Sequence, residues 1–327
     1  MYARTVTANE EGQRFDRYLH KLLPKAGNSF IYKMLRKKNI VLNSAKADGS
    51  EKLRAGDTVQ VYFSDETLEK FMGTRQKNYT EPVGKMPKHT YNLPIIYENE
   101  HILIADKPAG LLSQKAKADD FSLNDWLIQY LLENGNITEE SLKTFRPSVC
   151  NRLDRNTSGI VLCAKSVRGA QMLGNALKER GIRKFYRLYV KGSITEEKTI
   201  EGYLIKNEKN NKVQIRSDSV EKASYIKTKY APIKQYGDKT LLEVELITGK
   251  SHQIRAHLAG IGHPVLGDYK YGNRAWNDKY RARYGVKYQL LHAYKVVFPQ
   301  LGEPFGDISG REFTAPLPEI FDKVTDI

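Results

Sequence analysis

Cysteine and long apolar runs are both scarce in this chain of 327 residues. The two cysteines, Cys150 and Cys163, are too few for a disulfide framework and lack the paired spacing of a zinc site. No apolar run approaches the roughly 20 residues that a membrane-spanning helix needs, and the N-terminal stretch has no apolar segment of the signal-peptide type. These absences predict a protein of the reducing cytoplasm that has no membrane partner.

Acidic residues are the minority among the charged side chains. The 53 Lys and Arg against 38 Asp and Glu leave a formal net charge of +15. Such an excess favours a polyanionic partner, either nucleic acid or an anionic membrane surface, and does not by itself choose between them. Hydrophobic residues make up 40% of the chain, which is enough to bury a substantial core.

The positive charge is concentrated near the N-terminus. Between Arg14 and Lys38 the chain has eight Lys or Arg and one acid, Asp16. This segment contains two stretches of helical apolar spacing, "RFDRYLHKLL" and "SFIYKMLRKKN", and residues 40–63 show short strand patterns around turns. The pattern predicts a small α/β domain over residues 1–65. Its basic faces either are merely solvated or bind RNA, which would relieve their self-repulsion.

A larger domain is predicted after a polar linker over residues 66–92, which carries Pro and Gly and has no sustained apolar period. Residues 93–327 combine a strand-turn-strand signal at 93–112 with helical patterns at 124–134 and 167–180. Further strand patterns lie at 160–166, 185–192, 212–217, 223–233, 240–248 and 290–298. Because several of these follow one another with only turns between them, we expect an α+β domain with a mixed, mainly antiparallel sheet flanked by helices.

The segment "NRLDRNTSG", residues 151–159, places one carboxylate, Asp154, between Arg152 and Arg155. One interpretation is a simple turn, because Asn, Thr, Ser and Gly are common turn formers and an aspartate before them often binds local N–H groups. The other interpretation is a reacting carboxylate in a basic environment. The segment alone does not decide between them.

Several other chemistries are not supported. "ITGKS" at 247–251 resembles the end of a phosphate-binding loop, but Val244 stands where that motif needs glycine. His252, His257 and His263 are five and six residues apart, which does not place two imidazoles on one helical face, so we expect structural or RNA-facing roles. The sequence therefore predicts no metal site and no nucleotide cofactor.

Three segments in order carry a family resemblance: "HILIADKPAGLL" (101–112), "NRLDRNTSGIVLCAKS" (151–166) and "TGKSHQIRAHLAGIGHPVLGDYKYG" (248–272). The residues of these segments, their order and their spacing closely resemble those of the RluA-type pseudouridine synthases, over about residues 93–300. The two basic helical stretches are followed by "IVLN" and then by "LRAGDTVQV". This order resembles the small RNA-binding domain that a small-subunit ribosomal protein shares with several RNA-modifying enzymes. The resemblance implies RNA binding by this domain, for which the candidates are Arg14, Arg17, Lys33, Arg36, Lys37 and Lys38.

The resemblance also implies a reaction, the isomerisation of uridine in RNA to pseudouridine without cofactor or metal. It assigns Asp154 as the essential carboxylate, acting either as a nucleophile or as the base that removes the ribose 2′ proton. It implies that Arg255 is the ion-pair partner of Asp154 and that Tyr186 stacks on the target base. These roles are chemically reasonable, because a nearby cation keeps a carboxylate ionised and an aromatic ring tolerates rotation of a stacked base.

Arg152 is, by the same resemblance, the side chain that fills the space left when the target nucleotide is extruded from the RNA. Arg155 is expected to meet phosphate or to have no specific role. One residue departs from the family, which usually has His where this chain has Asn151. Asparagine keeps donor and acceptor capacity but not the ring, so the resemblance assigns Asn151 no contact.

The expected partner is large-subunit ribosomal RNA or a ribosome precursor, and we expect the protein to act as a monomer. Two alternatives stay open. The same reaction could take place on transfer RNA, or the chain could be a catalytically silent RNA-binding factor of ribosome assembly.

Overall fold

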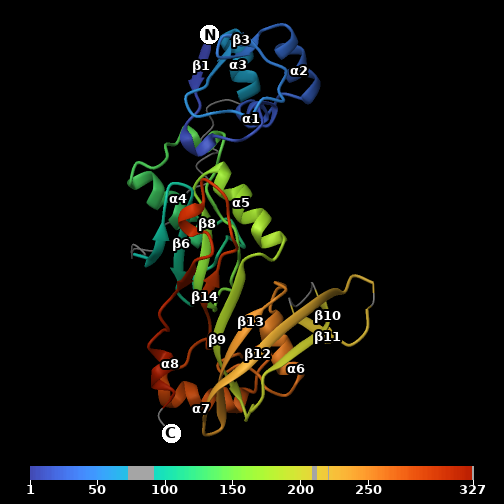
Figure 1. Cartoon of the computed structure of the whole chain (residues 1–327), viewed down its shortest axis with the longest axis vertical. Helices are drawn as coiled ribbons and strands as arrows, with labels where there is room; N and C mark the ends of the chain where they lie inside the picture. The colour runs from blue at the N-terminus through green and yellow to red at the C-terminus, as the bar shows by residue number, and fades with distance from the viewer. Residues whose placement is uncertain (73–91, 208–211, 220, 326–327) are drawn as a thin grey trace.

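The computed structural model describes residues 1–72, 92–207, 212–219 and 221–325. It has a smaller N-terminal unit at one end of the long axis and a larger unit that carries the C-terminus (Figure 1). Each unit has hydrophobic clusters of its own. Within the described residues, no helix combines the length and apolar character needed to cross a lipid bilayer.

The N-terminal unit is a four-stranded antiparallel sheet with helices packed on it. Its elements are β1 (Tyr2–Thr5), α1 (Phe15–Leu22), α2 (Asn28–Arg36), β2 (Ile40–Leu42), β3 (Ala45–Lys46), β4 (Thr58–Val61) and α3 (Asp65–Met72). The strand order is β1-β4-β2-β3. Phe15, Leu19 and Leu22 recur at helical spacing and are buried, so α1 presents one apolar face to the core. The helices α1 and α2 confirm the two predicted from the basic segment.

Helix α3 overlaps the first part of residues 66–92, which the sequence predicted as a linker. Leu68, Phe71 and Met72 follow one another at helical spacing and pack against the N-terminal core. The rings of Phe71 and Phe30 have centroids 4.1 Å apart. The apolar core of the first unit therefore extends to Met72, and the rest of the predicted linker, residues 73–91, lies outside the described residues.

The larger unit is built on an eleven-stranded sheet. Its strands are β5 (Ile95–Glu98), β6 (Ile102–Lys107), β7 (Ser148–Val149), β8 (Ser158–Ala164), β9 (Arg183–Lys191), β10 (Lys198–Asn207), β11 (Lys212–Arg216), β12 (Ser224–Tyr236), β13 (Lys239–Leu246), β14 (Leu291–Val297) and β15 (Glu312–Thr314). The order is β11-β10-β12-β13-β9-β14-β8-β6-β5, with β7 paired to β8 and β15 paired to β14. All described pairs are antiparallel except β14 with β8, which confirms the predicted α+β class. Strands β7, β10 and β15 were not predicted from the sequence.

The described helices of the larger unit are α4 (Leu123–Glu133), α5 (Val167–Lys178), α6 (Gln253–Gly260), α7 (Arg274–Tyr284) and α8 (Ile320–Lys323). Strand β8 separates two hydrophobic clusters, because Val161 and Cys163 face one cluster while Ile160 and Leu162 face the other. Helices α4 and α5 confirm the two predicted helices of this unit. Helix α6, which was not predicted, carries Arg255 toward the sheet.

A buried polar contact joins the two units. Arg4 of β1 donates to the Glu10 carboxylate at 2.8 Å, and the Thr144 hydroxyl of the larger unit binds the same carboxylate. Nearby, Arg168 of α5 donates to Glu11 at 2.7 Å. Because Glu10 is fully buried and paired, these contacts define how the N-terminal unit sits on the larger one.

Candidate active site

Asp154 lies in the loop between β7 and β8, and this loop is held by its neighbours. The Ser113 hydroxyl donates to the Leu153 carbonyl at 3.0 Å and accepts from the Leu153 N–H at 3.1 Å. The Thr157 N–H donates to the Asp154 carbonyl at 3.0 Å, which closes a turn. The turn interpretation and the reactive interpretation of "NRLDRNTSG" are therefore compatible, because the turn presents the Asp154 side chain.

A buried lysine holds the other side of the loop. Lys107, at the end of β6, is fully buried and donates to the carbonyls of Leu111 at 2.7 Å, Pro108 at 3.0 Å and Arg155 at 3.2 Å. Burial lowers the pKa of Lys107 to about 7, against the opposing charges of Asp154 and Asp106. Its three donors therefore tie "DKPAG" to the loop that carries the carboxylate. No role was predicted for Lys107 from the sequence, although a lysine within an apolar strand pattern is a visible signal.

Asn151, the departure from the family pattern, has a structural contact. Its side-chain oxygen accepts from the Leu162 N–H at 2.7 Å, and its amide nitrogen donates to the Ile160 carbonyl at 3.4 Å. These bonds fasten the start of the loop to β8 by satisfying two of its backbone groups. The asparagine therefore serves the loop in this chain through its amide.

Gly159, the last residue of the motif, permits a close approach between strands. A Cβ atom at this position would lie 2.2 Å from the Ala293 carbonyl oxygen, and the φ angle is +109°, which L side chains rarely adopt. Ala293 of β14 is paired with Gly159 on one side and with Tyr186 of β9 on the other. This contact sets the separation between the strand after Asp154 and the strand that carries Tyr186.

Arg255 joins Asp154 to a second carboxylate. Its Nη1 donates to Asp154 Oδ2 at 2.7 Å, while its Nε and Nη2 donate to the two oxygens of Asp268 at 2.7 and 2.9 Å. Burial alone would raise the pKa of Asp268, but the hydrogen bonds and charge of Arg255 outweigh it and lower that pKa. Asp268 thus fixes the guanidinium that faces Asp154.

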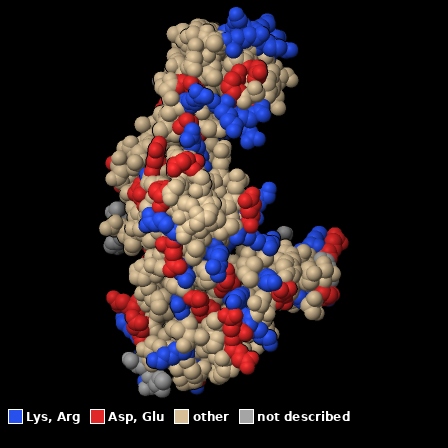
Figure 2. All heavy atoms as spheres, viewed as in Figure 1, with Lys and Arg blue, Asp and Glu red and all other residues tan. Residues whose placement is uncertain are grey.

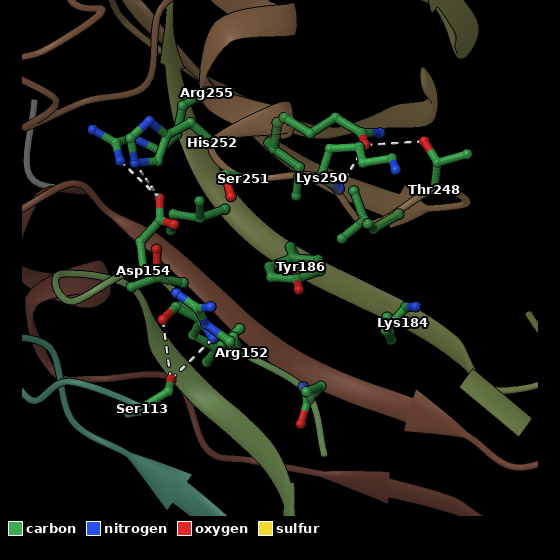
Figure 3. A pocket seen from close by; sticks show the side chains of 18 of the residues that line it. Ser113, Arg152, Asp154, Lys184, Tyr186, Thr248, Lys250, Ser251, His252 and Arg255 are labelled. Atoms are coloured by element: carbon green, nitrogen blue, oxygen red, sulfur yellow. Dashed lines mark hydrogen bonds and ion pairs between the residues drawn. The ribbon is translucent and has the colours of Figure 1, made fainter. Parts of the chain in front are cut away.

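Tyr186 lies on β9, opposite Val244 of β13 and Ala293 of β14, and is buried. Its ring lies beside the Asp154–Arg255 pair in the same pocket (Figure 3). Burial and then the charge of Asp154 raise the pKa of the Tyr186 hydroxyl, so the phenol stays protonated at neutral pH.

His252 also approaches Asp154, with its Nε2 3.8 Å from Asp154 Oδ2. It precedes α6 in a left-handed conformation with φ of 56°. The Tyr271 hydroxyl lies 2.8 Å from His252 Nδ1 and accepts from the Val213 N–H at 2.9 Å. Burial lowers the pKa of His252 despite the charge of Asp154. A neutral ring that accepts at Nδ1 carries its proton on Nε2, toward Asp154.

A cavity of about 910 Å³ contains these residues. Arg152, Asp154, Tyr186 and Arg255 all line it, so residues from three distant parts of the sequence meet at one site. The exposed Arg152 side chain lies beside Asp154 in Figure 3. Nine Lys or Arg residues line the cavity, and Asp154 is the only carboxylate among the described residues that do. Such a site favours an anionic ligand.

The predicted RNA-binding residues of the N-terminal unit lie away from this cavity. They are all exposed, and Figure 2 shows Lys and Arg gathered over the α2 side of the N-terminal unit. Arg14 differs from the rest because it pairs with Asp16 at 2.8 Å. None of the six is among the described residues that line the cavity.

Besides Lys107, two further residues of the site were not predicted from the sequence, Asp268 and Tyr271. Both lie in "GDYKYG", which belongs to the third family segment. His252 was expected to be structural or RNA-facing, and the structure places it in the cavity. His257 and His263 make structural contacts, with the Thr228 hydroxyl at 3.0 Å and the Lys191 carbonyl at 2.9 Å.

Metal ligands are not grouped in the part of the chain that the structure describes: no three His, Cys, Asp or Glu side chains come together to hold an ion.

The known proteins that this chain resembles are pseudouridine synthases. The family model described as RNA pseudouridylate synthase matches residues 101–260. The chain is 32% identical over 323 residues to the ribosomal large subunit pseudouridine synthase C of Vibrio vulnificus (strain CMCP6), covering 96% of this chain and 92% of that protein. It is 30% identical to the uncharacterized RNA pseudouridine synthase MG370 of Mycoplasma genitalium (strain ATCC 33530 / DSM 19775 / NCTC 10195 / G37), covering 90% of this chain and 88% of that protein.

A solved structure shares the fold. The human RNA Pseudouridylate Synthase Domain Containing 4 protein superposes with a TM-score of 0.55 at 20% identity. The match covers 70% of this chain and 90% of that one.

Proposed function

This chain belongs to the RNA pseudouridylate synthase family and is an RNA pseudouridine synthase, and we propose that it modifies large-subunit ribosomal RNA with Asp154 as the reacting carboxylate. The family prediction made from the three motifs is confirmed. The relative in Vibrio vulnificus is named for the large ribosomal subunit, which supports this substrate. The observation that carries the site is the 2.7 Å contact between Asp154 and Arg255 beside Tyr186 in one basic cavity.

Asp154 acts while ionised. The reaction breaks the bond between uracil N1 and ribose C1′, forms a bond from uracil C5 to the same C1′, and moves one proton from C5 to N1. An ionised carboxylate can attack as a nucleophile or remove the ribose 2′ proton, and both steps need the negative charge. A guanidinium at 2.7 Å supports that charge, and the side chain of Asp154 is 25% exposed, so a ribose can reach it.

Tyr186 supplies the platform for the uracil. The uracil must turn while bound, and an aromatic face supports a base without fixing its rotation, contributing about 1 to 3 kcal/mol. Because burial and Asp154 raise the pKa of Tyr186, its ring adds no negative charge beside the carboxylate.

Arg152 occupies the space that the target nucleotide leaves. The nucleotide must be extruded to reach Asp154, which costs a few kcal/mol. Arg152 is exposed, lines the cavity and is two residues from Asp154. Its guanidinium can stack on the bases that the extrusion separates.

The N-terminal unit binds the surrounding RNA through Arg17, Lys33, Arg36, Lys37 and Lys38, with Arg14 shared between RNA and Asp16. The exposure of all six cations and their concentration on α1, α2 and the turn after α2 support this role. A domain division near residue 72 is part of the same proposal.

We also propose that the protein is a cytoplasmic monomer. The two free thiols, Cys150 and Cys163, fit a reducing compartment. Light scattering tests the oligomeric state, and cell fractionation tests the compartment.

The test is to replace Asp154 with Ala and to map pseudouridines across total RNA from cells that carry the normal or the altered chain. We expect specific large-subunit pseudouridines to disappear while RNA affinity stays within about twofold. Replacement of exposed Asp278 with Asn is the control. Near-normal turnover by the Asp154 variant would refute the reacting role. A loss confined to transfer RNA would refute the substrate, and no loss on deletion of the protein would favour a silent assembly factor.

A further inference from the structure

Two cations in the cavity, Arg180 and Lys184, have no acidic partner among the residues that the structure describes. Lys184 precedes Tyr186 by two residues on β9, so both side chains point to the same face, about 7 Å apart along the strand. In Figure 3, Tyr186 lies between Lys184 and the Asp154 site. Among the described residues, Lys184 and Arg180 make no side-chain hydrogen bond or ion pair. Their charges therefore remain available to a ligand.

The two cations also repel each other in a partly desolvated place. Lys184 is half-buried. Its pKa is lowered first by burial and then by the charge of Arg180. Glu179, which neighbours Arg180 in sequence, is not among the described residues that line the cavity. In the free protein, the positive charges of Arg180 and Lys184 therefore repel each other. An anion bound between them would remove this repulsion.

Backbone conformation gives an independent indication. Arg180 follows the end of α5 with φ of +59°, and the Gly181 N–H donates to the Ala176 carbonyl at 2.8 Å. The Arg180 N–H donates to the Leu177 carbonyl at 3.3 Å. This pair of bonds is the Schellman ending of a helix, whose left-handed position is usually glycine. An arginine at that position is strained, and strained residues cluster where ligands bind.

We propose that Arg180 and Lys184 form a subsite for a phosphodiester group of the RNA strand, next to the nucleotide that enters beside Tyr186. The proposal rests on the proposed function, since it takes RNA as the ligand. The uracil itself carries no negative charge, so its recognition gives these cations no role, whereas a backbone phosphate matches both. A guanidinium and an ammonium can each donate to phosphate oxygens. The exposed Lys178 also lines the cavity and is the last residue of α5, two residues before Arg180.

The test compares Arg180→Gly, Lys184→Gln and a control, Lys279→Gln, which removes one exposed charge on α7 outside the cavity. The ligand is a large-subunit ribosomal RNA transcript that the unaltered protein modifies. Affinity is measured over a series of KCl concentrations, and steady-state kinetics are measured at one of them. Thermal unfolding of each variant checks that it folds.

We expect each cavity variant to reduce the slope of log affinity against log salt by about 0.7 to 0.9, which is the loss of one phosphate contact. KM should rise about tenfold with kcat nearly unchanged, because a phosphate contact binds the ground state and the transition state alike. Arg180→Gly should also raise the melting temperature, because glycine relieves the left-handed strain. A structural role of Arg180 predicts the opposite change in melting temperature.

The outcomes separate the two proposals. If the unaltered protein modifies the transcript while both cavity variants keep the slope and KM of Lys279→Gln, the phosphate subsite is wrong and the proposed function stands. If the unaltered protein neither binds nor modifies any large-subunit transcript, the substrate proposal fails and the subsite fails with it.

Discussion

Arg255 binds Asp154 with one nitrogen and Asp268 with two others, at distances of 2.7 to 2.9 Å. The two carboxylates differ in exposure, because the side chain of Asp154 is 25% exposed and that of Asp268 is 1% exposed. The bidentate contact to Asp268 also has the more restrictive geometry. Asp268 therefore anchors the guanidinium, and Asp154 is left accessible at its free side.

Replacement of Asp268 with Asn should lower both stability and activity. Breaking a buried ion pair on one side costs about 3 kcal/mol at neutral pH, and a guanidinium free to rotate reduces kcat by up to about a hundredfold through misplacement of Asp154. Denaturant unfolding and single-turnover kinetics measure the two effects, with Asp278→Asn as the exposed control. Unchanged kcat would show that Arg255 needs no anchor.

The same pair sets an acid limit on stability. The folded pKa of Asp268 lies below its ordinary 3.8, so its stabilising contribution is complete above that value and is lost as pH falls through the folded pKa. The difference in unfolding free energy between the normal chain and Asp268→Asn should therefore shrink below about pH 4. A difference that stays constant to lower pH contradicts this linkage.

Asn151 should be replaceable by Asp more easily than by Ala. Alanine leaves the buried Leu162 N–H without its acceptor, which costs about 1 to 3 kcal/mol, whereas aspartate keeps an acceptor in the same position. Unfolding free energies of the two variants, measured in parallel, check the order. Equal losses would mean that the 2.7 Å contact to Leu162 does not stabilise the loop.

Tyr271→Phe should raise the pKa of His252. Because the Tyr271 hydroxyl already accepts from the Val213 N–H, we infer that it donates to Nδ1 of the neutral ring, 2.8 Å away, and so disfavours protonation. Burial also lowers the pKa of His252 below 6.5. When the pKa of a histidine is lower in the folded chain, the unfolded chain binds the proton at a higher pH. Acidification through about pH 6.5 therefore lowers the free energy of unfolding. Tyr271→Phe should lose less of that free energy than the normal chain. Nitrogen-detected NMR titration of His252 provides the measurement. A pKa that stays the same or falls contradicts the inferred direction of the hydrogen bond.

Neutralising Lys33, Arg36, Lys37 and Lys38 should weaken RNA binding and flatten its salt dependence. Each lost phosphate contact should reduce the slope by about 0.7 to 0.9, because fewer counterions are released. Affinity measured over a KCl series, beside Lys279→Gln, separates specific contact from net charge. An unchanged slope would mean that these four side chains do not touch phosphate.

The motifs predicted more of the site than of the architecture around it. Asp154, Tyr186 and Arg255 were expected together and line one cavity, because a family pattern records residues that share a task. Helix α3 was missed because its three apolar residues lie in a polar stretch. Strand β10 was missed because "KTIEGYLIKN" mixes charge and glycine, and a strand of this composition is stabilised by its pairing with β11 and β12 more than by its own residue preferences.

By itself the sequence determined the family, the α+β class and the loop chemistry of "NRLDRNTSG", because these depend on residue types at short spacing. Only the tertiary structure decided that Asp268 anchors Arg255, that Ala293 separates Gly159 from Tyr186, and that Arg180 and Lys184 line the same cavity, in which Asp154 is the one carboxylate among the described residues. Those relationships join residues from different strands and helices. Their distances follow from sheet register and helix packing, which local spacing does not encode.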